Sequence, residues 1–288
     1  METRIHVNGV SIGVTIVEGA KQGDERTPTR GVPTIVLLHG FTGSAASWGG
    51  HLETSASHGF RVIALDMLGH GQSDAPTDPR RYAIAWCEAD ILAVLAVLGV
   101  HEGEAILLGY SMGGRIALYT AFSGFFRALI LESASSGLAD PLERAQRKNS
   151  DEQLAASIER DGIEAFVTYW EQLPLFASQQ RLLNEQQRAL HEQRLQNRPL
   201  GLANSLRSVG TGVQPNLQER LTTLTIPVLL LAGILDTKFC TIAQHMAQSL
   251  PHAQVHIIPD AGHTVHLEQP EVFDRMVIDF CKATFPTD

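Results

Sequence analysis

Cysteine is scarce in this sequence, and basic residues are outnumbered by acidic ones. The three cysteines, Cys87, Cys240 and Cys281, lie far apart without CxxC spacing, which argues against a disulfide framework and predicts free thiols in a reducing compartment. The formal net charge of -9 argues against a nucleic-acid partner, because phosphate binding needs clustered Lys and Arg. An acidic protein can still hold an anionic small molecule in a local basic pocket.

Long apolar runs are also missing. No uncharged stretch approaches the length of a membrane span, and the first residues lack the basic and then apolar order of a signal peptide. We therefore expect a cytoplasmic protein without a membrane partner. No internal repeat or low-complexity segment is present, and 288 residues suffice for one large domain or a core with an insert.

What the sequence does contain is an alternation of short apolar runs with helical patterns. Residues 4–18 alternate around Asn8-Gly9 and predict a hairpin, and residues 21–32 predict a loop. Buried strands are predicted at 34–38, 62–65, 105–108, 128–131, 228–231 and 255–258, and helices at 82–98, 112–122, 240–249 and 270–284. This order predicts an α/β protein with a mostly parallel central sheet flanked by helices and a ligand site at the carboxyl ends of the strands.

One long interruption divides the pattern. Residues 137–225 carry no strand pattern and predict several helices, inserted after the fourth central strand. We predict that they form a helical cap, with residues 1–136 and 226–288 forming the two parts of the core. The alternative is a peripheral insertion that does not contact substrate.

The sequence Gly109-Tyr110-Ser111-Met112-Gly113 joins a predicted strand to a predicted helix. This context matches a nucleophile elbow, in which a serine on a sharp turn is exposed at the start of a helix. Gly109 and Gly113 are predicted to allow close backbone approach there. Ser111 is therefore the candidate nucleophile.

A serine nucleophile needs an imidazole base and an orienting carboxylate, which follow the serine in this order in the chain. Asp236 and His263 follow the last two predicted strands and fill these roles. Asp260 and His266 are competitors, which we interpret as a loop-capping residue and as a surface or helix-entry residue. His263, His266 and Glu268 lack HExxH spacing on a helix, so no metal site is predicted.

The oxyanion hole is predicted from the backbone N–H groups of Phe41, after the first central strand, and of Met112. His39 and Gly40 are predicted to shape the first of these loops. Residues 66–73 predict a structural turn beside the site, with His70 in that turn as a less favoured alternative base.

The phrases LLHGFTGSAASW, LDMLGHGQSD, LLGYSMGGRIAL, LAGILDTKF and AGHTVHLEQP resemble the α/β-hydrolase superfamily over the whole chain. The segments FVTYWEQLPLFASQQRL and HEQRLQNRPLGLANSLRSVGTGVQPNL, with GYSMGGR, resemble the 2-succinyl-6-hydroxy-2,4-cyclohexadiene-1-carboxylate synthases of menaquinone or phylloquinone synthesis. That resemblance implies a lyase that removes pyruvate from a multiply carboxylated precursor without a cofactor. Ser111 would then abstract a proton instead of forming an acyl-enzyme.

The arginines agree with an anionic substrate. Arg115 lies one turn beyond Ser111 in an apolar helix, where a cation is unfavourable unless an anion is near. The resemblance implies that the substrate is bound by five residues: Tyr110, Arg115, Arg147, Trp170 and Arg194. The alternative for the cap arginines, Arg144 included, is a solvated face or an ion pair within the cap, and Lys238 is equally compatible with an ordinary surface position.

The rival function is a carboxylesterase, thioesterase or C–C bond hydrolase that uses the same three residues through an acyl-enzyme. A catalytically retired hydrolase that acts as a ligand receptor is disfavoured by the presence of Ser111, Asp236 and His263. The sequence favours neither a monomer nor a homo-oligomer.

Overall fold

The computed structural model describes residues 1–19 and 32–285, so most of the predicted loop at 21–32 lies outside the described residues. An eight-stranded, mostly parallel sheet forms the centre, as predicted. The strands are β1 (Glu2–Val7), β2 (Val10–Val17), β3 (Thr34–Leu38), β4 (Arg61–Leu65), β5 (Ala105–Tyr110), β6 (Ala128–Glu132), β7 (Val228–Gly233) and β8 (Ala253–Ile258).

The spatial order of the strands is β1-β2-β4-β3-β5-β6-β7-β8. β1 and β2 form the predicted antiparallel hairpin, whose turn uses left-handed backbone at Asn8 (φ 49°) and Gly9 (φ 78°). β2 also runs antiparallel to β4, and the remaining neighbours from β4 to β8 are parallel. The carboxyl ends of these parallel strands therefore share one edge, where residues from several loops can meet.

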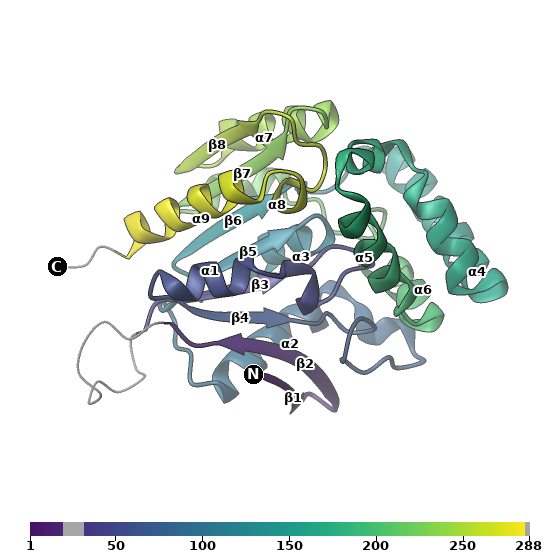
Figure 1. The fold of residues 1–288 in the computed structure, drawn as a ribbon, viewed down its shortest axis with the longest axis horizontal. Coiled ribbons are helices and arrows are strands. Elements are labelled where there is room, and N and C mark those ends of the chain that lie inside the picture. The colour runs from purple at the N-terminus through teal and green to yellow at the C-terminus, as the bar shows by residue number, and fades with distance from the viewer. Residues whose placement is uncertain (20–31, 286–288) are drawn as a thin grey trace.

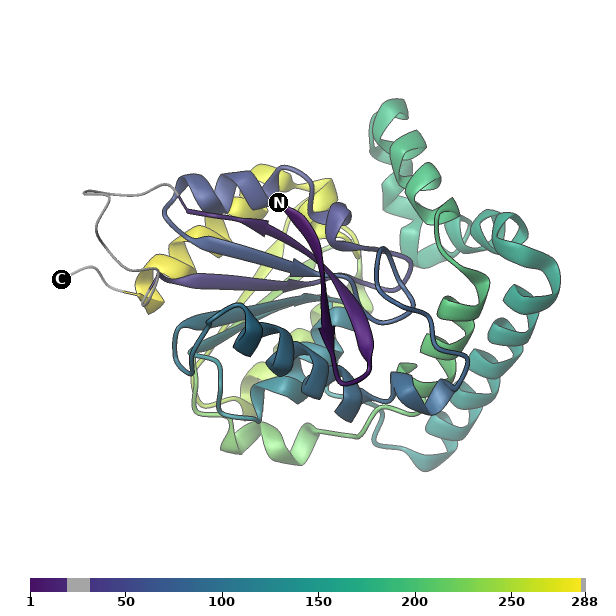
Figure 2. The same cartoon turned by 90° about the horizontal axis from the view of Figure 1, so that it is seen from below.

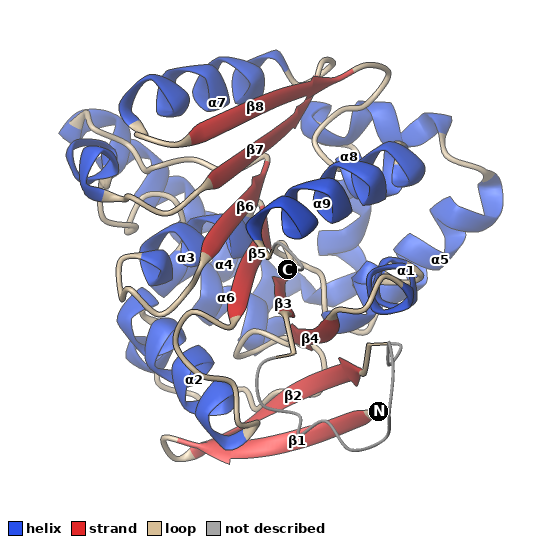
Figure 3. Cartoon of the chain, turned by 90° about the vertical axis from the view of Figure 1, so that its left-hand side faces the viewer, coloured by secondary structure: helices blue, strands red, loops and turns tan. Residues whose placement is uncertain are grey.

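Helices cover both faces of the sheet (Figures 1 and 3). One face carries α2 (Ile84–Val97), α3 (Met112–Ala121) and α7 (Thr237–Ser249), and the other carries α1 (His51–Ser57) and α9 (Pro270–Thr284). In β5, Leu107 packs in the first core while Ile106 and Leu108 pack in the second. Burial on both sides explains why the strand is apolar without alternation.

Two helices begin at different residues from those predicted. The pattern at 82–98 starts later as α2, because Pro79–Tyr82 form a short 3-10 helix, η2, capped by the side chain of Asp78. The pattern at 240–249 starts earlier as α7, because the carboxylate of Asp236 accepts a hydrogen bond from Phe239 N–H and caps the helix. The sequence pattern did not indicate α1.

The segment between β6 and β7 contains helices and no strand among its described residues. It contains α4 (Pro141–Glu171), η3 (Pro174–Arg181), α5 (Asn184–Leu195), α6 (Pro199–Val209) and η4 (Gln218–Thr223). α4 is interrupted at Gly162, whose φ is 83°, and its second half packs on α6 through Phe166, Val167 and Leu202. These helices lie beyond one end of the sheet (Figure 2). No helix within residues 1–19 and 32–285 is both long and apolar enough to cross a membrane.

Candidate active site

Ser111 lies on a strained turn between β5 and α3. Its φ of 51° is rare for a residue with a side chain, and its N–H donates to the carbonyl oxygen of Glu132 at 2.9 Å. A Cβ atom at Gly109 would lie 2.4 Å from Gly113 O, and one at Gly113 would lie 2.1 Å from Leu38 O. The close backbone approach predicted at both glycines is therefore present.

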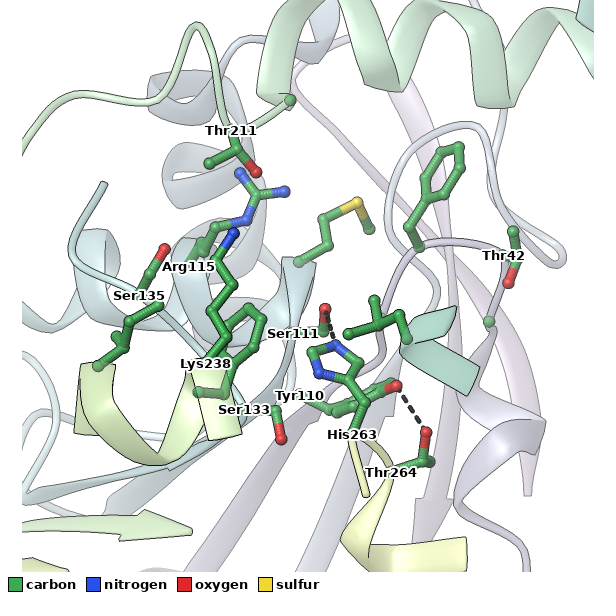
Figure 4. A pocket seen from close by; sticks show the side chains of 18 of the residues that line it. Thr42, Tyr110, Ser111, Arg115, Ser133, Ser135, Thr211, Lys238, His263 and Thr264 are labelled. Atoms are coloured by element: carbon green, nitrogen blue, oxygen red, sulfur yellow. Dashed lines mark hydrogen bonds between the residues drawn. The ribbon is translucent and has the colours of Figure 1, made fainter. Parts of the chain in front are cut away.

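His263 lies between Ser111 and Asp236. Its Nε2 atom is 3.0 Å from Ser111 Oγ (Figure 4). Its Nδ1 atom is 2.7 Å from Asp236 Oδ2. A carboxylate can only accept, so Nδ1–H donates to Asp236 and the free Nε2 lone pair accepts from the serine hydroxyl. The structure thus brings together the three predicted residues in the arrangement of a nucleophile, its base and the carboxylate that orients the base.

Burial and aromatic contacts hold the imidazole. His263 is only 2% exposed and Asp236 8%. Phe239 and Phe176 each meet the His263 ring edge to face, with ring centroids 4.7 Å and 6.1 Å away. Phe239 comes from α7 and Phe176 from the inserted segment, so both parts of the chain confine the ring.

A second carboxylate fixes the loop that carries His263. Glu268, in α8 (Val265–Glu268), accepts from Gly262 N–H at 2.7 Å and from Thr264 N–H at 3.2 Å. These two amides flank His263 on either side. The sequence does not reveal this role, because the phrase AGHTVHLEQP contains Glu268 but does not indicate where its carboxylate points.

The two competitors of the predicted pair have other environments. His266 lies in α8, consistent with a helix-entry position, but the prediction of a surface residue is wrong: it is 3% exposed and its Nδ1 is 2.8 Å from the buried carboxylate of Glu132. Asp260 is exposed with φ 58°, and its side chain makes no hydrogen bond to a described residue, so the loop-capping interpretation is wrong. Over residues 1–19 and 32–285, no three His, Cys, Asp or Glu side chains are grouped as metal ligands.

The predicted oxyanion amides lie at the edge of a cavity above Ser111. Phe41 and Met112 both line that cavity, and neither N–H donates to a described residue. His39 supports the loop of Phe41: its Nε2 accepts from Met67 N–H at 2.9 Å, so its Nδ1–H donates to Gly40 O at 2.8 Å. Burial lowers the pKa of His39 to about 4, which keeps the ring neutral in this role.

The cavity has a volume of about 880 Å³ and walls from both parts of the chain. All five residues predicted to bind substrate line it: Tyr110, Arg115, Arg147, Trp170 and Arg194. Lys238 also lines it and points to the same side as Arg115 (Figure 4). Arg144 does not line the cavity and instead donates to Gln214 O at 3.3 Å.

Arg115 has only neutral hydrogen-bond partners among the described residues. Its guanidinium donates to Val209 O at 2.7 Å and to Gln214 Oε1 at 3.2 Å. Burial, together with repulsion from Arg147, lowers the pKa of Arg115 to about 10, so it remains a cation at neutral pH. A partly buried cation with uncharged partners at the cavity wall can bind an anion.

The cap arginines have internal ion pairs. Arg147 Nε lies 2.8 Å from Asp151 Oδ1, and Arg194 Nη1 lies 3.0 Å from Glu171 Oε1. Within the described chain, the buried Arg194 Nε and Trp170 Nε1 atoms have no hydrogen-bond acceptor. The alternative of an intra-cap ion pair is therefore realised for both arginines, although both also line the cavity.

A chain of hydrogen bonds that the sequence does not reveal joins the cap to the elbow. Tyr110 Oη lies 2.8 Å from Thr264 Oγ1, which also accepts from Gln179 Nε2 at 2.9 Å. Gln179 Oε1 in turn accepts from Arg194 Nη2 at 3.0 Å. No sequence pattern marks Gln179 or Thr264, because their importance depends on which side chains the cap places opposite them.

Comparisons with known proteins show which family and which relatives the chain resembles. The model of the α/β hydrolase fold family matches residues 33–270. A Salmonella paratyphi C protein named 2-succinyl-6-hydroxy-2,4-cyclohexadiene-1-carboxylate synthase is 34% identical over 244 residues, which are 83% of this chain and 90% of the relative. A Bacillus subtilis protein that bears the same name provisionally is 42% identical over 272 residues, 94% of this chain and 98% of the relative.

Solved structures give the same picture. MenH from S. aureus matches with a TM-score of 0.86 and 35% identity, over 94% of this chain and 98% of its own. A thermophilic esterase from Thermogutta terrifontis matches with a TM-score of 0.82 and 23% identity, over 99% of both chains, which shows a shared fold alone.

Proposed function

The chain belongs to the α/β hydrolase fold family and, within it, to the 2-succinyl-6-hydroxy-2,4-cyclohexadiene-1-carboxylate synthases, and on that basis we propose a lyase of menaquinone or phylloquinone synthesis. Its substrate is 2-succinyl-5-enolpyruvyl-6-hydroxy-3-cyclohexene-1-carboxylate. Its products are pyruvate and the cyclohexadiene carboxylate for which the relatives are named.

The structure of this substrate defines the chemistry. The hydrogen on C2 is acidified by the neighbouring succinyl carbonyl, and the enolpyruvyl oxygen on C5 is the leaving group. Removal of the C2 proton forms C2=C3, shifts the ring double bond to C4=C5 and breaks the C5–O bond. The released enolpyruvate takes up a proton and becomes pyruvate, so the elimination is balanced without a cofactor.

Ser111 is the group that we assign to proton removal. As Ser111 Oγ takes the C2 proton, its own proton passes to His263 Nε2, 3.0 Å away. The resulting imidazolium is stabilised by Asp236, 2.7 Å from Nδ1. His263 then returns a proton to the leaving enolpyruvate, and no acyl-enzyme forms.

The free amides of Phe41 and Met112 provide the proposed oxyanion hole. When the C2 proton leaves, negative charge develops on the succinyl carbonyl oxygen. Two backbone N–H groups without other acceptors in the described chain stabilise that oxygen, and Met112 adds the positive end of the α3 dipole.

The three carboxylates of the substrate account for the cations of the cavity. We assign their binding to Arg115, Arg147 and Arg194, with Tyr110 and Trp170 shaping the ring site. In this proposal residues 137–225 form the cap, and residues 1–136 and 226–288 form the core that carries Ser111, Asp236 and His263.

One observation carries the proposal: Arg115 projects into the cavity one turn beyond Ser111 with only neutral acceptors in the described chain. The direct test is to incubate the purified protein with the enzymatically prepared precursor and to follow pyruvate with lactate dehydrogenase. We expect pyruvate release that is lost in Ser111→Ala.

Adding an aryl-ester assay to this experiment distinguishes the lyase from the rival hydrolase. A carboxylesterase or thioesterase with this triad would leave the precursor unchanged and would hydrolyse an aryl ester with a burst of product from acyl-enzyme formation. Absence of pyruvate release by the wild-type protein would overturn the proposed lyase activity.

A further inference from the structure

We propose that Gln179 is a positioning residue that connects the substrate-binding arginine of the cap, Arg194, to the loop of the base His263. This inference rests on the proposed function and extends it, because it assigns a role to a residue that contacts neither Ser111 nor His263 directly. Gln179 lies in η3 and is 7% exposed, so its amide exchanges few hydrogen bonds with water.

Both the oxygen and the nitrogen of the Gln179 amide form hydrogen bonds. Arg194 Nη2 can only donate, so the atom 3.0 Å away is the amide oxygen, which fixes the orientation of the group. The amide nitrogen then donates to Thr264 Oγ1 at 2.9 Å. A single side chain therefore spans the distance from a cap cation to the residue that follows His263.

Thr264 connects Gln179 to Tyr110, which belongs to the elbow. Its hydroxyl accepts from Gln179 and also lies 2.8 Å from Tyr110 Oη, where either oxygen can be the donor. Tyr110 precedes Ser111, and its ring lies 5.5 Å from the His263 ring, centroid to centroid. The chain of hydrogen bonds thus ends on the immediate neighbours of both the nucleophile and the base.

A second contact follows the same path. The Arg194 guanidinium lies over the Phe176 ring at 5.3 Å, and Phe176 meets the His263 ring edge to face. Arg194 is itself held by Glu171, and its buried Nε donor has no acceptor in the described chain. Arg194 lines the cavity, so a substrate carboxylate bound by its guanidinium would be connected to the loop of His263 through Gln179.

Positioning of this kind affects the chemical step more than binding. A small displacement of a catalytic base raises the barrier to proton transfer, whereas loss of uniform binding raises KM alone. We therefore expect Gln179→Met, which keeps the length of the side chain and removes both hydrogen bonds, to lower kcat about tenfold. KM should change less than kcat.

Gln187→Met is the matched control. Gln187 lies in the same cap segment, and among the described residues its amide donates only to the carbonyl oxygens of Gln180 and Leu182. This variant should retain the wild-type kcat. Thermal unfolding of both variants shows whether a loss of activity follows from loss of the fold instead of loss of the contact.

A double-mutant cycle tests the connection itself. Thr264→Val removes the hydroxyl that Gln179 contacts, and Thr264→Ser restores it. The combined effect of Gln179→Met and Thr264→Val on kcat should be smaller than the product of the two single effects, because both break one chain. A combined effect equal to that product, or a kcat for Gln179→Met equal to that of Gln187→Met, would overturn the proposal.

A spectroscopic measurement keeps this test separate from the proposed function. If the wild-type protein releases no pyruvate, the lyase assignment fails, but the imidazole resonances of His263 still report on its loop. Gln179→Met should shift or broaden those resonances, and Gln187→Met should leave them in place. Unchanged His263 resonances in Gln179→Met would contradict the positioning role whatever the reaction is.

Discussion

Arg115 shows how the environment of a single side chain defines the substrate. Its hydrogen bonds to Val209 and Gln214 orient the guanidinium, and neither partner neutralises it. An esterase acting on neutral esters has no use for such a cation beside its nucleophile, whereas a carboxylate substrate does.

We predict that Arg115→Ala lowers kcat/KM for the precursor by about 10- to 100-fold, the equivalent of one lost charge-assisted hydrogen-bond pair. Hydrolysis of a neutral aryl ester, where measurable, should change little. Arg188→Ala, at an exposed position of α5, is the control and should affect neither reaction. Equal loss on both substrates would assign Arg115 to the fold instead of to substrate binding.

The buried His70 side chain makes the stability of the protein depend on pH. Burial, with a contribution from nearby His39, lowers the pKa of His70 from 6.5 to about 3. In the unfolded chain the His70 imidazole is protonated below about pH 6.5. In the folded protein it stays neutral until the pH falls to about 3. The free energy of unfolding should therefore fall by about 1.4 kcal/mol per pH unit as the pH decreases through this window.

The test compares how steeply the free energy of unfolding changes with pH in the two proteins, instead of its absolute value. His70→Asn keeps a donor in the place of Nδ1, 3.2 Å from Leu68 O, and removes the titration. Urea unfolding between pH 6.5 and pH 4 should show a shallower pH dependence in His70→Asn, by about one proton. Identical slopes in the two proteins would show that His70 titrates in the folded state as it does in the unfolded one.

For single residues, the sequence predicts those that belong to a motif. It does not predict those that act by contacting the motif residues or their loops. Ser111, Asp236 and His263 were found because each follows a strand in a fixed order. Gln179 and Glu268 were not, because nothing in an isolated sequence shows that one faces Arg194 or that the other accepts from the amides beside His263.

Among the elements, the short loop between β8 and α8 has the most direct effect on chemistry. Glu268 closes this loop by accepting from both Gly262 N–H and Thr264 N–H. The imidazole between them is fixed on one side by Asp236 and at its backbone by Glu268.

We expect Glu268→Ala to lower kcat about tenfold or more while KM changes little, because a loosened loop misplaces the base. Glu268→Gln retains one acceptor oxygen and should fall between the wild-type protein and Glu268→Ala. Glu271→Gln, at an exposed position of α9, is the control. A parallel rise in KM without loss of kcat would mean that Glu268 acts on substrate binding.

The elements were predicted more reliably than their ends. Both faces of β5 are buried, which its uninterrupted apolar run indicates. The start of α7 at Thr237 was not predicted, because the capping carboxylate belongs to Asp236, which the sequence had already assigned to catalysis. A single residue here both begins a helix and orients the base.

For the whole molecule, the close approach of cap and core is the decisive contact. A Cβ atom at Gly201, in α6, would lie 2.1 Å from the carbonyl oxygen of Gly69 in the core. Gly69 itself has a φ of 87°, so neither backbone can yield easily. The insert is thereby seated on the turn at residues 66–73.

We predict that Gly201→Ala displaces α6 and destabilises the protein by about 1–3 kcal/mol, as overpacking does in a tight interface. Limited proteolysis should then cut within residues 137–225 faster than in the wild-type protein. Gly50→Ala, where an added Cβ meets nothing within 4 Å, is the control. Unchanged proteolysis and stability in Gly201→Ala would show that the cap adapts to the extra methyl group.

The position of the insert also determines when the active centre can exist during synthesis. Ser111 precedes residues 137–225, and His263 follows them, 152 residues after the serine. A ribosome therefore synthesises the elbow and the entire cap before it translates the orienting Asp236 and the base. The nascent chain consequently carries an unactivated hydroxyl until its final strands are made, and no incomplete product of translation that ends before β8 can turn over substrate.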